Sequence, residues 1–194
     1  MAASSDPLSP GSSEPRSITL PGILLGVGLG GFVDGILLHQ VLQWHHMLTS
    51  ASTANIPIGD YPATTVHGLQ MNTLWDGLFH TFTWLCVLAG LEILYARITH
   101  DHRRAWASRV LWGWILAGWG LFNLVEGIVD HHVLGIHHVV SGPHQTLADL
   151  AFLGLGALLV LGGWLLQRSA RPGVVADGAV VIGREGSPGD RGPR

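Results

Sequence analysis

The sequence DGILLHQVLQWHH, from Asp34 to His46, follows an apolar run and returns 92 positions later as EGIVDHHVLGIHH, from Glu126 to His138. Both copies carry an acidic residue, Gly, Ile, His, Val, Leu and a final His-His pair at the same places. Chance is a poor explanation for this match, because histidines and acidic residues are rare in membrane-spanning segments. The sequence therefore predicts a duplicated polar site inside a membrane.

The composition favours a membrane protein. Of 194 residues, 47% are hydrophobic and 12% are charged, whereas soluble domains carry about 25% charged residues. The net charge of -3 is too small to indicate nucleic-acid binding. Cys86 is the only cysteine, so an intramolecular disulfide is excluded, and we expect it to be a small apolar helix residue.

Four apolar segments are long enough to cross a bilayer, which takes about 20 residues. We expect transmembrane helices at about residues 19–44, 73–98, 110–134 and 147–166. A match of Thr73–Asp76 to Thr146–Asp149 extends the repeat into the second and fourth helices. The predicted fold is therefore all-α, a four-transmembrane-helix bundle built from two tandem helical hairpin repeats. It occupies residues 18–167, between tails at 1–17 and 168–194 that are predicted to be disordered.

The arginines predict how these helices are oriented. Four arginines lie in residues 97–109 and five from Arg168 onward, whereas residues 47–71 and 135–145 contain neither Lys nor Arg. Because basic residues accumulate in cytoplasmic loops, we expect both termini in the cytoplasm and the two histidine-bearing loops outside. The protein is thus predicted to be a multi-pass protein of the cell inner (cytoplasmic) membrane.

Polar residues on these helices are predicted to gather near the outer side. If the helices continue at about 1.5 Å per residue, His39 and His131 lie about 10 Å deeper than the final His-His pairs, which reach the water interface. Asp76 descends from the same side on the second helix. The candidate metal ligands are His39, His131, Asp76, His80, Asp149, Asp34, Glu126, Asp130, His45, His46, His137 and His138.

Each candidate also has a structural interpretation. The His-His pairs suit the headgroup level, the deeper histidines suit a hydrogen bond to an acid, and the deepest carboxylates suit a contact that locks helices together. His80 is a weaker candidate, because Leu153 stands at its place in the second repeat.

The chemistry of these residue types points to a metal. A charged residue at the centre of a membrane helix costs about 2.5–3.5 kcal/mol on insertion scales, so the carboxylates should face inward and pair with histidine or a cation. Imidazoles beside carboxylates on facing helices suit a transition metal. Copper is the first choice, with zinc or iron second. His39 and His131, at equal depth, would also suit a b-type haem.

The segment from Phe32 to Met47 resembles the signature of a family of predicted bacterial membrane proteins, domain of unknown function 2243. The segment from Asn123 to His132 is similar to a later motif of that family, and the resemblance covers residues 18–167. It implies a four-helix protein of the cytoplasmic membrane without an established activity. It also implies an association with cytochrome oxidase assembly factors, and so copper or haem handling.

Three functions are compatible with these residues. The leading hypothesis is a non-catalytic membrane protein with an outward-facing metal site that handles copper for respiratory oxidase assembly. Its partners would be the lipid bilayer and a respiratory oxidase or its assembly factors. The first alternative is a haem-binding redox protein or membrane metalloenzyme, and the second is a proton or ion pathway. No catalytic residue and no oligomeric state are predicted.

Overall fold

The computed structural model describes residues 17–100, 103–104, 108–170 and 180–181. The helices are α1 (Thr19–Phe32), continued by the π-helix η1 (Val33–Val41), α2 (Val66–His100), α3 (Ser108–Glu126), continued by the π-helix η2 (Gly127–Leu134), and α4 (Gln145–Arg168). Strands β1 (Arg103–Arg104) and β2 (Val180–Val181) form a short antiparallel pair. The predicted tails fall largely outside the described residues.

Four continuous helices are long and apolar enough to cross a membrane: Thr19–Val41, Val66–Thr99, Arg109–Leu134 and Gln145–Arg168. The predicted all-α membrane fold is therefore confirmed. α2 begins within the stretch that was expected to be a loop, because the Thr65 hydroxyl caps the new helix by accepting a hydrogen bond from the Gly68 N–H at 3.1 Å.

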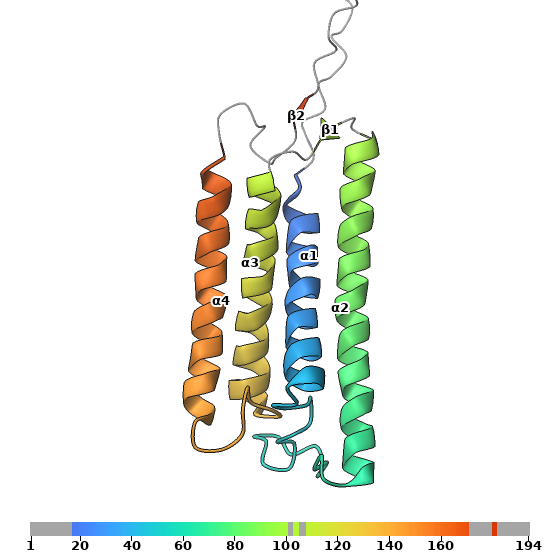
Figure 1. Ribbon diagram of the computed structural model, residues 1–194, viewed down its shortest axis with the longest axis vertical. Coiled ribbons are helices and arrows are strands. Elements are labelled where there is room, and N and C mark those ends of the chain that lie inside the picture. Colours follow the sequence, from blue (N-terminus) through green and yellow to red (C-terminus); the bar gives the residue numbers. More distant parts are fainter. Residues whose placement is uncertain (1–16, 101–102, 105–107, 171–179, 182–194) are drawn as a thin grey trace, which may run out of the picture.

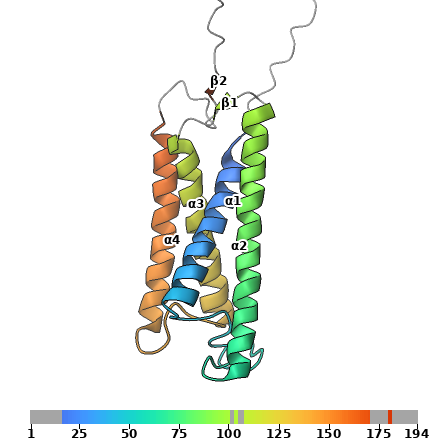
Figure 2. The ribbon, with the colours of Figure 1, turned by 45° about the vertical axis from the view of Figure 1, so that its right-hand side comes forward.

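The four helices stand side by side in the order α4, α3, α1, α2 (Figure 1). α1 packs against α3 at the centre, α2 packs against α1, and α4 packs against α3. Seen from a second direction, α1 crosses α3 at an angle (Figure 2). α1 and α3 thus form the inner pair, and the two histidine-bearing π-helices continue these inner helices.

Glycines allow the two inner helices to approach closely. A Cβ atom at Gly26 would collide with the Ile115 carbonyl oxygen and lie 2.8 Å from the Gly118 Cα. Gly118 meets the backbone of Ile23 in the same way. Small residues at such a contact bring helix backbones together in a bilayer, where burial of apolar side chains gives little net attraction between helices.

The loops after the two π-helices lie together at one end of the row, opposite the start of α1 and the end of α4 (Figure 1). The first loop crosses onto the end of η2. The Ser50 N–H donates to the Ile136 carbonyl at 2.9 Å, and the Asn55 N–H donates to the Leu134 carbonyl at 2.9 Å. The ends of α1 and α3 are therefore tied to one another where the polar residues lie.

Candidate metal centre

The π-helices bring each acidic residue beside a histidine. A π-helix has hydrogen bonds from residue i to i+5, so residues five apart lie about one turn apart on the same side. Asp34 and His39 are five apart, as are Glu126 and His131. In an α-helix, residues five apart lie about 140° apart around the axis and therefore on different faces. The wider turn is the physical reason that they meet.

A left-handed residue follows each π-helix, two residues after the end of η1 and directly after the end of η2, and turns the chain back. Gln43 has φ 50° and Gly135 has φ 65°. The following N–H groups bond far back along the chain, from Trp44 to the Leu38 carbonyl at 2.9 Å and from Ile136 to the Asp130 carbonyl at 3.0 Å. The next residues are thereby carried inward instead of onward to the water interface.

His45 and His137 are the residues carried inward, with 1% and 0% of their surfaces exposed. The sequence placed them at the outer interface, because it assumed that the helices continue to that point. Burial, together with the nearby histidines, lowers the pKa of His45 to about 2. Its ring is therefore neutral and has a lone pair available for a metal.

The first triad consists of Asp34, His39 and His45. The Nε2 atoms of the two histidines lie 3.0 Å apart. Asp34 places Oδ2 3.3 Å from His39 Nε2 and Oδ1 4.0 Å from His45 Nε2. The three residues are buried, and their ligand atoms all lie within 4.8 Å of one another, close enough to hold a metal ion.

The second triad consists of Glu126, His131 and His137, each 92 positions after its counterpart. Glu126 Oε1 lies 2.9 Å from His131 Nε2 and 2.7 Å from His137 Nε2. This triad is also buried and meets the same 4.8 Å limit. Glu126 Oε2 is buried without a hydrogen-bond partner, and the two ring nitrogens of His131 have carboxylate oxygens nearby at angles that do not form hydrogen bonds.

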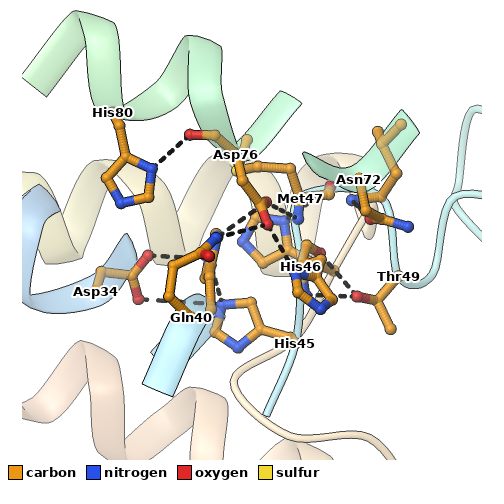
Figure 3. Close-up of polar contacts among 12 residues, drawn as sticks. Asp34, Gln40, His45, His46, Met47, Thr49, Asn72, Asp76 and His80 are labelled. Atoms are coloured by element: carbon orange, nitrogen blue, oxygen red, sulfur yellow. Dashed lines mark hydrogen bonds and ion pairs between the residues drawn. The ribbon is translucent and has the colours of Figure 1, made fainter. Parts of the chain in front are cut away.

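An outer carboxylate supports each triad. Asp76 comes from α2, and its Oδ1 accepts from His39 Nδ1 and the Met47 N–H, both at 3.0 Å. Its Oδ2 accepts from His46 Nδ1 at 2.6 Å (Figure 3). Gln40 Nε2 donates to the same oxygen at 3.4 Å. Asp76 therefore fixes the ring of His39 so that Nε2 points toward Asp34.

Asp149 of α4 occupies the corresponding position beside the second triad. Its Oδ1 lies 3.3 Å from His131 Nδ1 and accepts from the Val139 N–H at 3.0 Å. Its Oδ2 accepts from His138 Nδ1 at 2.8 Å. Carboxylates that hold the second nitrogen of a histidine ligand are common around protein-bound metals.

The loop histidines are oriented by backbone carbonyls from across the molecule. His45 Nδ1 donates to the Val139 carbonyl at 3.0 Å, and His137 Nδ1 donates to the Met47 carbonyl at 3.3 Å. A carbonyl only accepts, so each ring carries a proton on Nδ1. Nε2 then faces the triad, 3.0 Å from His39 Nε2 for His45 and 2.7 Å from Glu126 Oε1 for His137.

The first triad thus brings two imidazole nitrogens and a carboxylate together. His39 donates from Nδ1 to Asp76, and His45 donates from Nδ1 to a carbonyl, so their Nε2 atoms face each other at 3.0 Å beside the Asp34 carboxylate. When both rings are neutral, these two lone pairs repel unless a proton or a metal cation lies between them. Glu126 shows the same attraction for a cation, since its contact outweighs burial and raises the pKa of His137.

Ten of the twelve predicted ligands are brought together by this arrangement, either in the triads or around the outer carboxylates. His80 is separate, because its Nδ1 donates to the Asp76 carbonyl at 2.7 Å and its Nε2 is buried without a hydrogen-bond partner. Asp130 is half-buried and lies outside both triads. It lines an apolar cavity of about 330 Å³ with Phe79, Phe82 and Glu126.

A polar cavity of about 280 Å³ opens beside the second triad. It is lined by Thr53, Asn55, His131, His132, Gly135, His138, Gln145, Thr146 and Asp149. Hydroxyl, amide and imidazole groups are suitable for a hydrated cation. Because His131 lines it, the cavity reaches the second triad.

Three supporting groups were missed from the sequence. Met47 and Val139 act through their backbones, and only their position directly after each His-His pair could have indicated them. Asn72 is fully buried, accepts from the Leu48 N–H at 2.9 Å and donates to the Tyr61 carbonyl at 2.8 Å. It holds the first loop in place, and an amide at the start of an apolar helix was its only signal.

Four apolar helices and two buried His/carboxylate triads define a membrane protein with groups that could bind metal ions. The chain belongs to the family described as "Predicted membrane protein (DUF2243)", which it matches over residues 21–170. The resemblance seen in the sequence is thereby confirmed. No curated protein and no solved structure matches the chain.

Proposed function

We propose that this protein binds transition-metal ions inside the membrane, one at each triad. The observation that carries the proposal is the convergence of His39 Nε2, His45 Nε2 and the Asp34 carboxylate in a buried site. With both rings neutral, a metal ion would be bound by all three groups at once. Glu126 Oε2, which is buried without a hydrogen-bond partner, supports the same conclusion for the second triad.

The donor set restricts the choice of metal. Each triad offers two imidazoles and one carboxylate and lacks a thiolate or thioether. Zn(II), Fe(II) and Cu(II) accept such ligands, whereas Cu(I) prefers sulfur. The copper handling for respiratory oxidase assembly that the sequence suggested is therefore proposed for Cu(II). A haem between His39 and His131 is disfavoured, because other imidazole rings occupy the space beside them. The His45 ring centroid lies 4.5 Å from that of His39, and the His137 ring centroid lies 5.0 Å from that of His131.

The test is metal analysis of the full chain purified in detergent after separate exposure to copper, zinc and iron. We expect tightly bound metal in molar amounts and an absorbance spectrum without a Soret band. Protein that binds none of the three metals would refute the proposal. If such a protein carried protons across proteoliposome membranes, and if substitution of Asp34 and Glu126 abolished this flux, these carboxylates would instead belong to a proton pathway.

Replacing Asp76 by asparagine is expected to weaken metal binding by about 10- to 100-fold, the usual effect of losing an outer partner of a histidine ligand. The amide has one acceptor in place of two, so it cannot serve His39, His46 and Met47 together. Competition with a chelator measures the affinity. Asp60→Asn, at an exposed loop carboxylate, is the control and should leave it unchanged.

We further propose that metal ions reach the triads through the polar cavity from the outer side of the membrane. The cavity opens among loops that lack Lys and Arg, as expected of loops outside the cytoplasm. His131 of the second triad is among its lining residues.

Thr146→Arg is expected to slow metal loading by at least about tenfold, because a cationic side chain in this cavity repels an incoming cation. Stopped-flow mixing with Zn(II) and a fluorescent chelator measures the rate, and the amount bound at equilibrium should change little. Thr64→Arg adds the same charge at an exposed loop residue and is the control. Equal loading rates in the two variants would exclude this route.

A further inference from the structure

We infer that the two triads form a single two-metal centre, in which each ion influences the other. This inference rests on the proposed function and concerns how the two sites are joined. Three features support it. They are the spacing of the four buried imidazole rings, the backbone hydrogen bonds that join the two triads, and the number of buried carboxylates.

The rings of different triads are as close as the rings within one triad. His39 and His45, in the first triad, have centroids 4.5 Å apart, and His131 and His137, in the second, 5.0 Å apart. His45 and His137 belong to different triads, yet their rings are stacked at 5.0 Å with an interplanar angle of 6°. The four imidazoles therefore form one continuous cluster.

The backbone of Met47 is in contact with groups of both triads. Met47 donates its N–H to Asp76, which holds His39 of the first triad, and accepts at its carbonyl from His137 of the second triad. A ligand of each triad is thus oriented through the same residue. A shift of Met47 when one triad binds an ion will move a ligand of the other.

Val139 makes the reciprocal connection. It donates its N–H to Asp149, which lies against His131 of the second triad, and accepts at its carbonyl from His45 of the first triad. Two such links close a loop of contacts through both triads. We therefore expect the two ions to bind cooperatively.

The buried charges fit two divalent ions. Four carboxylates surround the cluster, and each is at most 6% exposed. Among the described residues, their ion-pair contacts are made to histidines alone. Two divalent cations with neutral imidazoles balance four carboxylates, whereas a single ion leaves a net negative charge in a membrane-embedded cluster. The carboxylates are Asp34, Asp76, Glu126 and Asp149.

Cu(II) is a suitable probe, because its unpaired electron reports a second Cu(II) nearby. The full chain in detergent is titrated with Cu(II), the bound ions are counted by native mass spectrometry, and the electron paramagnetic resonance spectrum is recorded. We expect two ions per chain, little population of the one-ion form, and a spectrum broadened or reduced by coupling between the ions.

Two matched variants give the uncoupled reference. Asp34→Asn/His39→Gln disables the first triad, and Glu126→Gln/His131→Gln disables the second, with side-chain volume approximately kept. Each should bind one Cu(II) and give the sharp spectrum of an isolated ion. Size-exclusion elution and circular dichroism identify a variant that has not folded, in which case the other variant supplies the reference.

The results separate this inference from the proposed function. Two ions with spectra of isolated Cu(II) in the wild type would overturn the two-metal centre and leave two independent metal sites. A single ion per chain would also overturn it. A wild-type chain that binds no metal would remove the proposed function itself.

Discussion

The double variant His39→Ala/His131→Ala is expected to lose its tightly bound transition metal. Each substitution removes one of the two imidazoles of a triad and leaves one imidazole and one carboxylate. Loss of a direct ligand should exceed the about 10- to 100-fold weakening that follows loss of an outer partner. Metal analysis after dialysis against a chelator measures the effect.

Two further proteins make this result interpretable. His67→Ala/His144→Ala removes two exposed histidines near the same loops and should keep full metal content. His39→Gln/His131→Gln nearly keeps the side-chain volume and a hydrogen-bonding group, so it distinguishes loss of ligands from collapse of a cavity. Unchanged metal content in both triad variants would show that the histidines are structural.

Replacing Gly26 by leucine is expected to prevent stable packing of α1 against α3. Overpacking usually costs about 1–3 kcal/mol where side chains can move aside. Here the obstacles are the Ile115 carbonyl oxygen, the Trp119 backbone nitrogen and the Gly118 Cα, so the helices themselves must separate. A side chain can relieve such a clash by changing rotamer, but backbone atoms cannot. We therefore expect the free energy of unfolding to fall by more than about 3 kcal/mol.

Unfolding of the detergent-solubilised protein, followed by circular dichroism, measures this loss. Gly154→Leu is the matched control, because a Cβ at Gly154 of α4 meets nothing within 4 Å. That change should be neutral or slightly stabilising, since glycine is about 1 kcal/mol less favourable than alanine inside a helix. Equal stability of the two variants would show that the inner pair is looser than the structure describes.

The four spans could be predicted because a membrane imposes a length and a polarity on each helix. The partners of each helix could not be predicted, because lipid-facing and helix-facing positions are both apolar. Gly26 and Gly118 were visible as small residues, but their contact with each other depends on the crossing of α1 and α3. The arrangement in a row was therefore found only in the structure.

The site residues could be predicted better than their geometry. Their types and repetition put all six triad residues among the twelve candidate ligands but did not group them into triads. The five-residue spacing of Asp34 and His39 matches the hydrogen-bond period of a π-helix, but the sequence analysis did not use it. The chain turns inward toward His137 at the left-handed Gly135, and a sequence can suggest such a turn because glycine adopts positive φ readily. The chain turns inward toward His45 at the left-handed Gln43, and a glutamine gives no sign of such a turn. Backbone contacts of Met47 leave no trace in residue type.

The carbonyls of Met47 and Val139 make the α1–α2 hairpin and the α3–α4 hairpin depend on each other. Each hairpin holds a histidine whose ring is oriented by the other hairpin. A hairpin produced alone would keep its carboxylates and histidines and lose the acceptor that aims its buried loop ring. The surface between α1 and α3 therefore behaves as the interface of an obligate heterodimer contained in one polypeptide, and competence to bind metal belongs to the joined pair.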